Sequence, residues 1–211
     1  HRNVVPILME GLRRLEYRGY DSAGLAVLDG SGIGRARTLG KVAMLEELLR
    51  SDPRSADVGI AHTRWATHGE PSEANAHPHM SGTRVALVHN GIIENHAPLR
   101  EAQSSQGYVH TSQTDTEVIA HQVDIHLEHG LDLLAAVRAT ATQLRGAYAL
   151  GVVSRDEPRR IVGVRVGSPL VIGIGVDEHF IASDVAALIA VTQQFIFLEE
   201  GDLVDINEES L

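Results

Sequence analysis

Apolar side chains recur along the first half of the chain at the spacing of amphipathic helices. Leu8, Leu12 and Leu15 fall on one helical face, so the pattern predicts a helix over residues 4–17 that stops at Gly19. We also expect helices over residues 42–49, 99–103, 115–129 and 132–143. Thr114 and Glu117 have the spacing of a capping box, which supports a helix start at this point.

Short apolar runs bounded by turn residues predict strands, most of them in the last third of the chain. Two earlier runs, residues 58–61 and 85–88, lead into polar segments, and a third covers residues 24–28. The later runs are residues 147–153, 161–166, 170–174, 180–182, 195–198 and 203–206. Because strands follow strands there while helices cluster earlier, the order predicts an α+β protein with much antiparallel sheet, not a doubly wound α/β fold.

Composition and charge narrow the class of protein. The chain has 211 residues, which suggests one domain or at most two small ones, and its net charge of −10 argues against a nucleic-acid surface. It contains no cysteine, which excludes a disulfide scaffold and a thiolate zinc site. No apolar run is long enough to span a bilayer, so we expect a cytoplasmic protein with no membrane partner. The chain does not begin with Met, so residue 1 is not expected to be the natural start.

The segment of residues 62–71 has a composition that a fold alone would not require. It holds Arg64, Trp65, two histidines and two threonines directly after a predicted strand. Binding groups concentrate in loops held by rigid strands, so we expect part of a ligand site here. Composition alone also allows a surface loop whose tryptophan covers the core.

Asn90 and Gly91 follow the predicted strand over residues 85–88. An Asn amide can donate to a developing oxyanion, and a neighbouring glycine lets a backbone N–H approach the same point. The alternative is an Asn-Gly turn that closes a hairpin, with Ile92 and Ile93 starting the next strand.

Three other features have simpler interpretations. His77 and His79 flank a proline, and solvated or structural roles are more typical of such histidines than metal binding. Asp115 at a helix start favours that terminus electrostatically, with or without a ligand. The glycines at 173 and 175 lack the remainder of a dinucleotide fingerprint. We therefore expect neither a metal nor a cofactor.

Together, Arg64, Asp115 and the Asn90-Gly91 pair suit an amino acid as ligand. Arg64 would bind the α-carboxylate, Asp115 the α-ammonium group, and Asn90 with Gly91 a side-chain carbonyl under attack. A nucleophile is missing from this set, because no Ser or Thr lies in a recognisable nucleophile elbow.

Several long motifs, in order along nearly the whole chain, resemble the class II glutamine amidotransferases, which are N-terminal-nucleophile hydrolases. The motifs are residues 13–24, 59–69, 75–79, 88–95, 114–117, 144–148 and 167–170. Within that class they resemble the members that pass ammonia to fructose 6-phosphate and form glucosamine 6-phosphate. The resemblance implies a four-layer αββα sandwich over residues 1–211, glutamine as substrate, and homodimers of the full-length enzyme.

The resemblance also implies a mechanism and residue roles. An N-terminal Cys attacks the glutamine amide, and its own α-amine is the general base. Arg64 and Asp115 would hold the substrate, and Asn90 and Gly91 would form the oxyanion hole. The other roles are pocket lining by Thr67, His68 and His77, closure of the ammonia route by Trp65, and support of the nucleophile by Arg18.

The chain departs from the family pattern at its start. The family begins Cys-Gly-Ile-Val-Gly, and neither this run nor any cysteine is present. We therefore expect that the first strand, with the nucleophile, and the downstream isomerase domains lie outside these 211 residues. Two alternatives remain, namely a class II amidotransferase with a different acceptor and a non-catalytic amino-acid-binding module.

Overall fold

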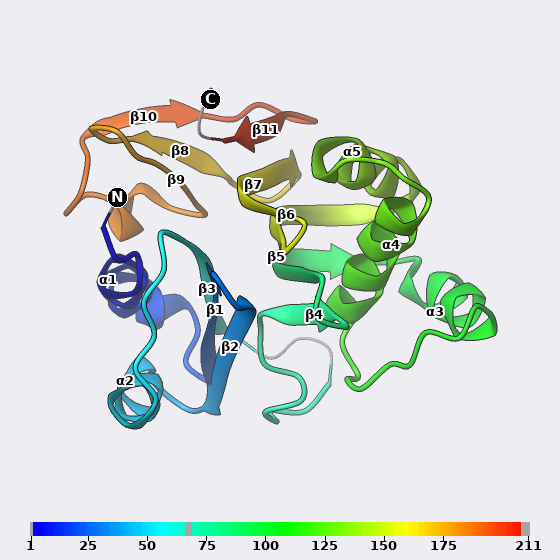
Figure 1. The fold of residues 1–211 in the computed structure, drawn as a ribbon, viewed down its shortest axis with the longest axis horizontal. Helices are drawn as coiled ribbons and strands as arrows, with labels where there is room; N and C mark the ends of the chain where they lie inside the picture. Colours follow the sequence, from blue (N-terminus) through cyan, green and yellow to red (C-terminus); the bar gives the residue numbers. More distant parts are fainter. Residues whose placement is uncertain (1, 66–68, 208–211) are drawn as a thin grey trace.

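The computed structural model describes residues 2–65 and 69–207, and it orders them as layers of helix, sheet, sheet and helix (Figure 1). The first half contributes α1 (Val5–Leu15), a 3-10 turn η1 (Glu16–Arg18), β1 (Ser22–Asp29), β2 (Gly32–Leu39), α2 (Val42–Ser51), β3 (Val58–Arg64), β4 (His79–Ser81) and β5 (Val85–Ile93). The second half contributes α3 (His96–Ser105), α4 (Thr116–Glu128), α5 (Leu133–Gln143), β6 (Gly146–Ser154), β7 (Glu157–Val166), β8 (Val171–Ile174), β9 (His179–Ala182), η2 (Val185–Ala187), β10 (Gln194–Phe197) and β11 (Leu203–Ile206).

Two sheets form the middle of the sandwich. The first has the order β2-β1-β3 and the second β11-β7-β6-β5-β4, and their strands pair in an antiparallel manner. Helices α1 and α2 cover the outer face of the first sheet, and α4 and α5 cover the outer face of the second (Figure 1). A third antiparallel sheet, β10-β8-β9, packs beside the second. This arrangement confirms the expected αββα layers.

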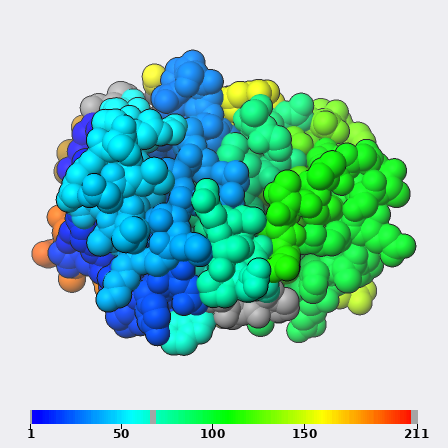
Figure 2. Space-filling view, turned by 90° about the horizontal axis from the view of Figure 1, so that it is seen from below, coloured from blue at the N-terminus to red at the C-terminus, as the bar shows by residue number. Residues whose placement is uncertain are grey.

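Strand β1 explains why the layers stack in this order. It is buried on both faces, because alternate side chains point to opposite sides of a sheet. Leu25 and Val27 pack against α1 and α2, whereas Ala26 and Leu28 pack against the second sheet. Small residues such as Ala26 in the sheet-to-sheet layer let the two sheets approach closely. In the space-filling view, the blue and cyan first layer lies beside the green α3–α4 region (Figure 2).

The helices and most strands agree with the sequence-based expectation, but three strands do not. Strands β2 and β4 were not expected, and β5 continues to Ile93 instead of ending at Val88. In β2, Ala36 is the one buried residue, so the side chains of this strand show no alternation of apolar and polar positions. The backbone pairing of β2 with β1 decides the conformation of the strand instead. The described helices include none that is long and apolar enough to cross a membrane.

The expected capping box at the start of α4 forms only in part. The Glu117 N–H approaches the Thr114 hydroxyl at 3.4 Å, but the Glu117 carboxylate accepts from the N–H and hydroxyl groups of Thr111 and Ser112. Burial raises the pKa of Glu117, but these hydrogen bonds outweigh burial and bring that pKa to about 2. The carboxylate thereby fixes residues Thr111 and Ser112 in the loop that leads into α4.

Candidate active site

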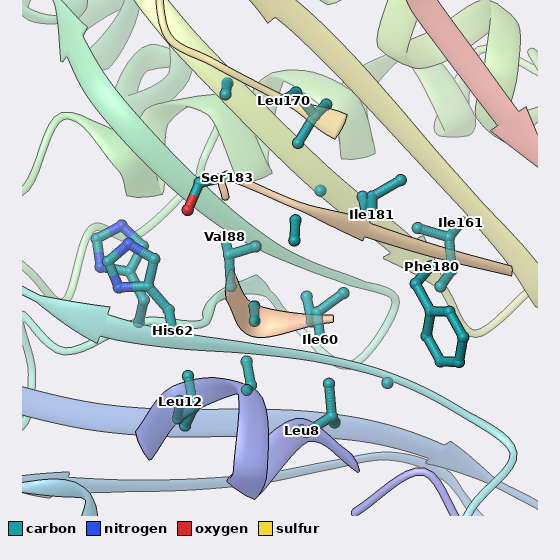
Figure 3. Close-up of a pocket in the computed structure, with 18 of the residues that line it drawn as sticks. Leu8, Leu12, Ile60, His62, Val88, Ile161, Leu170, Phe180, Ile181 and Ser183 are labelled. Carbon is teal, nitrogen blue, oxygen red and sulfur yellow. The ribbon is translucent and has the colours of Figure 1, made fainter. Parts of the chain in front are cut away.

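A cavity of about 520 Å³ runs between β3 and β9 across the face of the second sheet. One part of its lining is apolar and another part is polar. Figure 3 shows the apolar groove, with His62 to one side of it. The labelled apolar side chains of the groove are Leu8, Leu12, Ile60, Val88, Ile161, Leu170, Phe180 and Ile181. Helix α1 and strand β3 supply one wall, and β9 with the second sheet supplies the other.

The polar part brings together residues that are far apart in the sequence. Every candidate residue that the structure describes lines this one cavity: Arg18, Arg64, Trp65, His77, Asn90, Gly91 and Asp115. Thr67 and His68 lie outside the described residues. The candidates come from η1, the end of β3, the segment before β4, β5 and the start of α4, so only the sandwich places them side by side.

Asn90 and Gly91 lie inside a continuous strand, and the hairpin-turn alternative is therefore wrong. They pair with Ala149 and Tyr148 in β6, and β5 continues beyond them to Ile93. Gly91 has a φ of +132°, and a Cβ at this position would lie 2.0 Å from the Ala147 carbonyl oxygen. No residue with a side chain fits there, so the glycine is required by the close packing of the two strands.

Arg64 and Asp115 place opposite charges in the wall of the polar part. Both residues are 4% exposed. Arg64 donates to the Gly69 carbonyl at 3.2 Å, and burial lowers its pKa although the charges of Asp21 and Asp115 oppose this effect. Asp115 accepts from the Ile93 N–H at 2.7 Å, which fixes its carboxylate between β5 and α4. A buried cation and a buried anion in one cavity match the two charges of an α-amino acid.

Four histidines, His62, His77, His79 and His89, form a cluster beside this pair. The rings of His62 and His77 stack with centroids 4.2 Å apart, and His79 meets His77 edge-on at 4.8 Å. His77 and His89 both bond to the Thr116 hydroxyl, at 3.0 and 2.9 Å. Among the described residues, no group of three or more histidines and carboxylates could hold a metal ion. His77 and His79 are buried, so the interpretation of them as solvated is wrong and the structural one is supported.

Burial favours the neutral form of three of these histidines, His62, His77 and His79. Desolvation lowers the pKa of His62 to about 4 and that of His79 to about 3. It also lowers the pKa of His77, and the neighbouring imidazoles and Arg64 add to that effect. Neutral imidazoles can lie against one another and against the Arg64 cation without strong repulsion.

The free energy of unfolding should therefore fall steeply as the pH is lowered from about 6.5 towards 4. In that window the unfolded chain binds protons at His62 and His79 that the folded chain excludes, so unfolding takes up on the order of one to two protons. The loss linked to Glu117 lies lower, between its ordinary pKa and about 2. Urea unfolding at a series of pH values measures the slope. His79→Gln should reduce it by up to about one proton, and an unchanged slope would contradict the assignment.

Arg18 and Trp65 lie at the more open parts of the cavity. Arg18 approaches the Asp184 carboxylate at 3.4 Å, with both side chains about a third exposed. Trp65 is 58% exposed and contacts Tyr20 edge-to-face at a centroid distance of 5.6 Å. This exposure places Trp65 at the surface, which both the ligand-site expectation and the surface-loop alternative allow.

A Ser-His-Asp cluster elsewhere in the molecule does not have the geometry of a catalytic triad. The Ser81 hydroxyl lies 2.8 Å from both the His121 Nδ1 atom and the Asp124 carboxylate. In a triad the histidine lies between the other two, and the serine must be accessible. Here Ser81 is in the middle and 1% exposed, so the cluster joins β4 to α4.

The layered fold is that of known amidotransferases. A solved structure of glutamine phosphoribosylpyrophosphate amidotransferase from B. subtilis is similar to this chain, with a TM-score of 0.85 and 24% sequence identity. The match covers 100% of this chain and 46% of the amidotransferase chain. That likeness places the sandwich in the N-terminal-nucleophile class of hydrolase folds, as expected from the motifs.

The sequence comparison is more specific. A model of the glutamine amidotransferase domain matches residues 62–190, and the chain belongs to that family. It is 58% identical over 211 residues to the glutamine–fructose-6-phosphate aminotransferase (isomerizing) of Pseudomonas aeruginosa. It is 57% identical to the protein of the same name from Escherichia coli K12. The chain spans 34% of the length of each of these relatives.

Proposed function

We propose that this chain hydrolyses glutamine to glutamate and ammonia, within an enzyme that transfers the ammonia to fructose 6-phosphate. The observation that carries the proposal is the joint position of Arg64, Asp115, Asn90 and Gly91 around one cavity. The first two complement the charges of an α-amino acid, and the last two supply donors for a reacting carbonyl. Membership of the glutamine amidotransferase family supports glutamine as that amino acid.

Each residue then has a separate task. Arg64 binds the α-carboxylate, Asp115 binds the α-ammonium group, and the Asn90 amide with the Gly91 N–H stabilises the oxyanion. Proposed roles for the remaining residues are support of the nucleophile by Arg18, closure of the ammonia route by Trp65, and pocket lining by Thr67, His68 and His77.

The apolar groove supports a nucleophile on a strand that lies outside this sequence. Strands β3 and β9 are edge strands of two separate three-stranded sheets, and both line the groove. An extended segment between them would join the two sheets and place apolar side chains against Leu8, Ile60 and Ile181. We assign the groove to a first strand upstream of residue 1, with its N-terminal Cys at the polar end near Asn90.

The proposed reaction has two halves. The cysteine thiol loses its proton to its own α-amine, and the sulfur attacks the side-chain amide carbon of glutamine. The tetrahedral oxyanion collapses, the C–N bond breaks, and ammonia leaves with the transferred proton. Water then adds to the thioester, the C–S bond breaks, and glutamate leaves with the thiol restored.

The acceptor is proposed from the relatives' names. Proteins 57–58% identical to this chain are named glutamine–fructose-6-phosphate aminotransferases, and about two thirds of their length lies outside the match. We therefore assign the sugar-phosphate site to isomerase domains downstream, in a cytoplasmic, homodimeric enzyme of amino-sugar synthesis. Transfer of ammonia to a different acceptor is the alternative, and an assay of glucosamine 6-phosphate formation by the full-length enzyme decides between them.

Arg64→Ala in the full-length enzyme should raise the KM for glutamine about ten- to a hundredfold, the effect of losing one strong charged interaction. The value of kcat should change much less, because the carboxylate clamp acts in the ground state as well as the transition state. Arg64→Lys should restore only part of the affinity, because Lys lacks the planar fork. Steady-state kinetics of glutamate release measure both, and a parental KM in Arg64→Ala would contradict the role.

Asp115→Asn is the companion test at the ammonium end. The Asn oxygen can still accept the Ile93 N–H, so this substitution removes the charge and keeps the hydrogen bond that fixes the side chain. We expect the KM for glutamine to rise here as well, with the same assay as readout.

A further inference from the structure

His62, in the cavity wall, directly contacts the Asn90 amide. Its Nε2 atom lies 2.9 Å from the Asn90 Oδ1 atom. His62 belongs to β3 in the first sheet and Asn90 to β5 in the second, so this hydrogen bond crosses between the two sheets. No role for His62 emerged from the sequence, where it is one polar residue in a motif.

The bond decides which atoms of the Asn90 amide are left for a ligand. A carboxamide has an oxygen that only accepts and a nitrogen with two hydrogens to donate. If His62 Nε2 carries a hydrogen, it occupies the oxygen and leaves both N–H groups. If the amide were turned round, one N–H would be used on the imidazole and the oxygen would repel an oxyanion.

The surroundings hold the His62 ring in place. It stacks on His77, whose Nε2 atom is bonded to the Thr116 hydroxyl at the start of α4. The same hydroxyl binds His89, the residue before Asn90 in β5. The ring is therefore supported from the element that carries Asp115 and from the strand that carries Asn90. Desolvation lowers the pKa of His62 to about 4, so at neutral pH the ring has one N–H and no charge.

We propose that His62 is a positioning residue for the oxyanion hole, whose Nε2–H group donates to Asn90 Oδ1 and directs the Asn90 N–H groups at the amide under attack. The proposal rests on the glutaminase function proposed above. A positioned donor costs no reorganisation as charge develops, which is why its loss should act on the transition state.

Two amide substitutions of different length test the geometry. The amide nitrogen of a Gln side chain can occupy nearly the position of the His Nε2 atom. The Asn side chain is shorter, so its amide nitrogen does not reach that position. In the full-length enzyme, His62→Gln should keep kcat for glutamate release within about threefold. His62→Asn should lower kcat about ten- to a hundredfold, with a nearly constant KM for glutamine. This loss of kcat is smaller than the loss expected when an oxyanion donor itself is removed.

A double-mutant cycle with Asn90→Ala makes the test specific. If His62 acts through Asn90, His62→Asn should cause no further loss of kcat in the Asn90→Ala background. Equal losses of kcat in His62→Gln and His62→Asn would indicate that His62 acts only through packing, and would overturn the proposal. Additive losses of kcat in the double-mutant cycle would overturn it as well. If the parent enzyme releases no glutamate at all, the glutaminase function is wrong and this inference with it. An active parent with an unaffected His62→Asn variant refutes the inference alone.

Discussion

Residues 1–211 alone should release no glutamate from glutamine, and activity should appear when the proposed upstream strand, beginning Cys-Gly-Ile-Val-Gly as the family resemblance implies, is added ahead of residue 1. The chain has no cysteine, and the hydroxyls of Thr114 and Thr116 in the cavity wall are bonded to histidines of the cluster. A thiol is far more nucleophilic at neutral pH than a hydroxyl and needs only a modest base. Loss of a nucleophile removes most of the catalysis, leaving what binding and the oxyanion hole supply.

The added strand should also stabilise the fold. It would pair with β3 and β9, which are edge strands in the described part of the chain, and bury apolar side chains in the groove between them. The entropy lost in ordering the strand offsets much of this gain. We therefore expect the free energy of unfolding to rise by about 2–3 kcal/mol, equivalent to a Tm rise of roughly 5–10 °C. Thermal unfolding of the chain with and without the strand measures the rise.

The matched control is the extended chain with Cys→Ala at its first position. It should show the higher Tm and no glutamate release, which separates the structural effect of the strand from the chemical effect of the thiol. Robust turnover by the cysteine-free chain, or by this control, would refute the mechanism. An extended chain that binds glutamine without hydrolysing it would favour the amino-acid-binding module instead.

Asn90→Ala should lower kcat for glutamine hydrolysis by on the order of 10²–10³ in the full-length enzyme, with glutamine binding largely intact. Removing one donor to an oxyanion in an enclosed site costs this much because no water replaces it with the same geometry. The substitution also removes the acceptor for His62, whose ring nitrogen lies 2.9 Å away.

Asn95→Ala provides the comparison, because Asn95 follows soon after in the sequence but bonds elsewhere. Its side chain donates to the Gln143 carbonyl and accepts from the Arg145 N–H, and it does not line the cavity. This variant should lower stability and leave kcat near that of the parent. If Asn90→Ala kept the parental kcat, Asn90 would have only the structural role of a strand residue.

The elements and the candidate residues were predictable to different extents. Helices α1, α4 and α5 follow from apolar spacing, and the late strands from short β-branched runs between turns, because local patterns report local structure. Strand β2 was missed because only Ala36 in it is buried, so its pairing with β1 leaves no alternation to recognise. The continuation of β5 through Asn90 and Gly91 was missed because Asn-Gly is locally a turn signal.

The motif resemblance identified the candidate residues, but it did not determine how they are arranged. The sequence by itself determined the family resemblance, the α+β class, the absence of cysteine from these 211 residues and the opposite charges of Arg64 and Asp115. Only the tertiary structure decided that Asn90 lies within a strand, that His62 contacts it from another sheet, and that β3 and β9 face one groove. The physical reason is that these relations join residues distant in the chain through the packing of sheets, and that packing has no local periodicity.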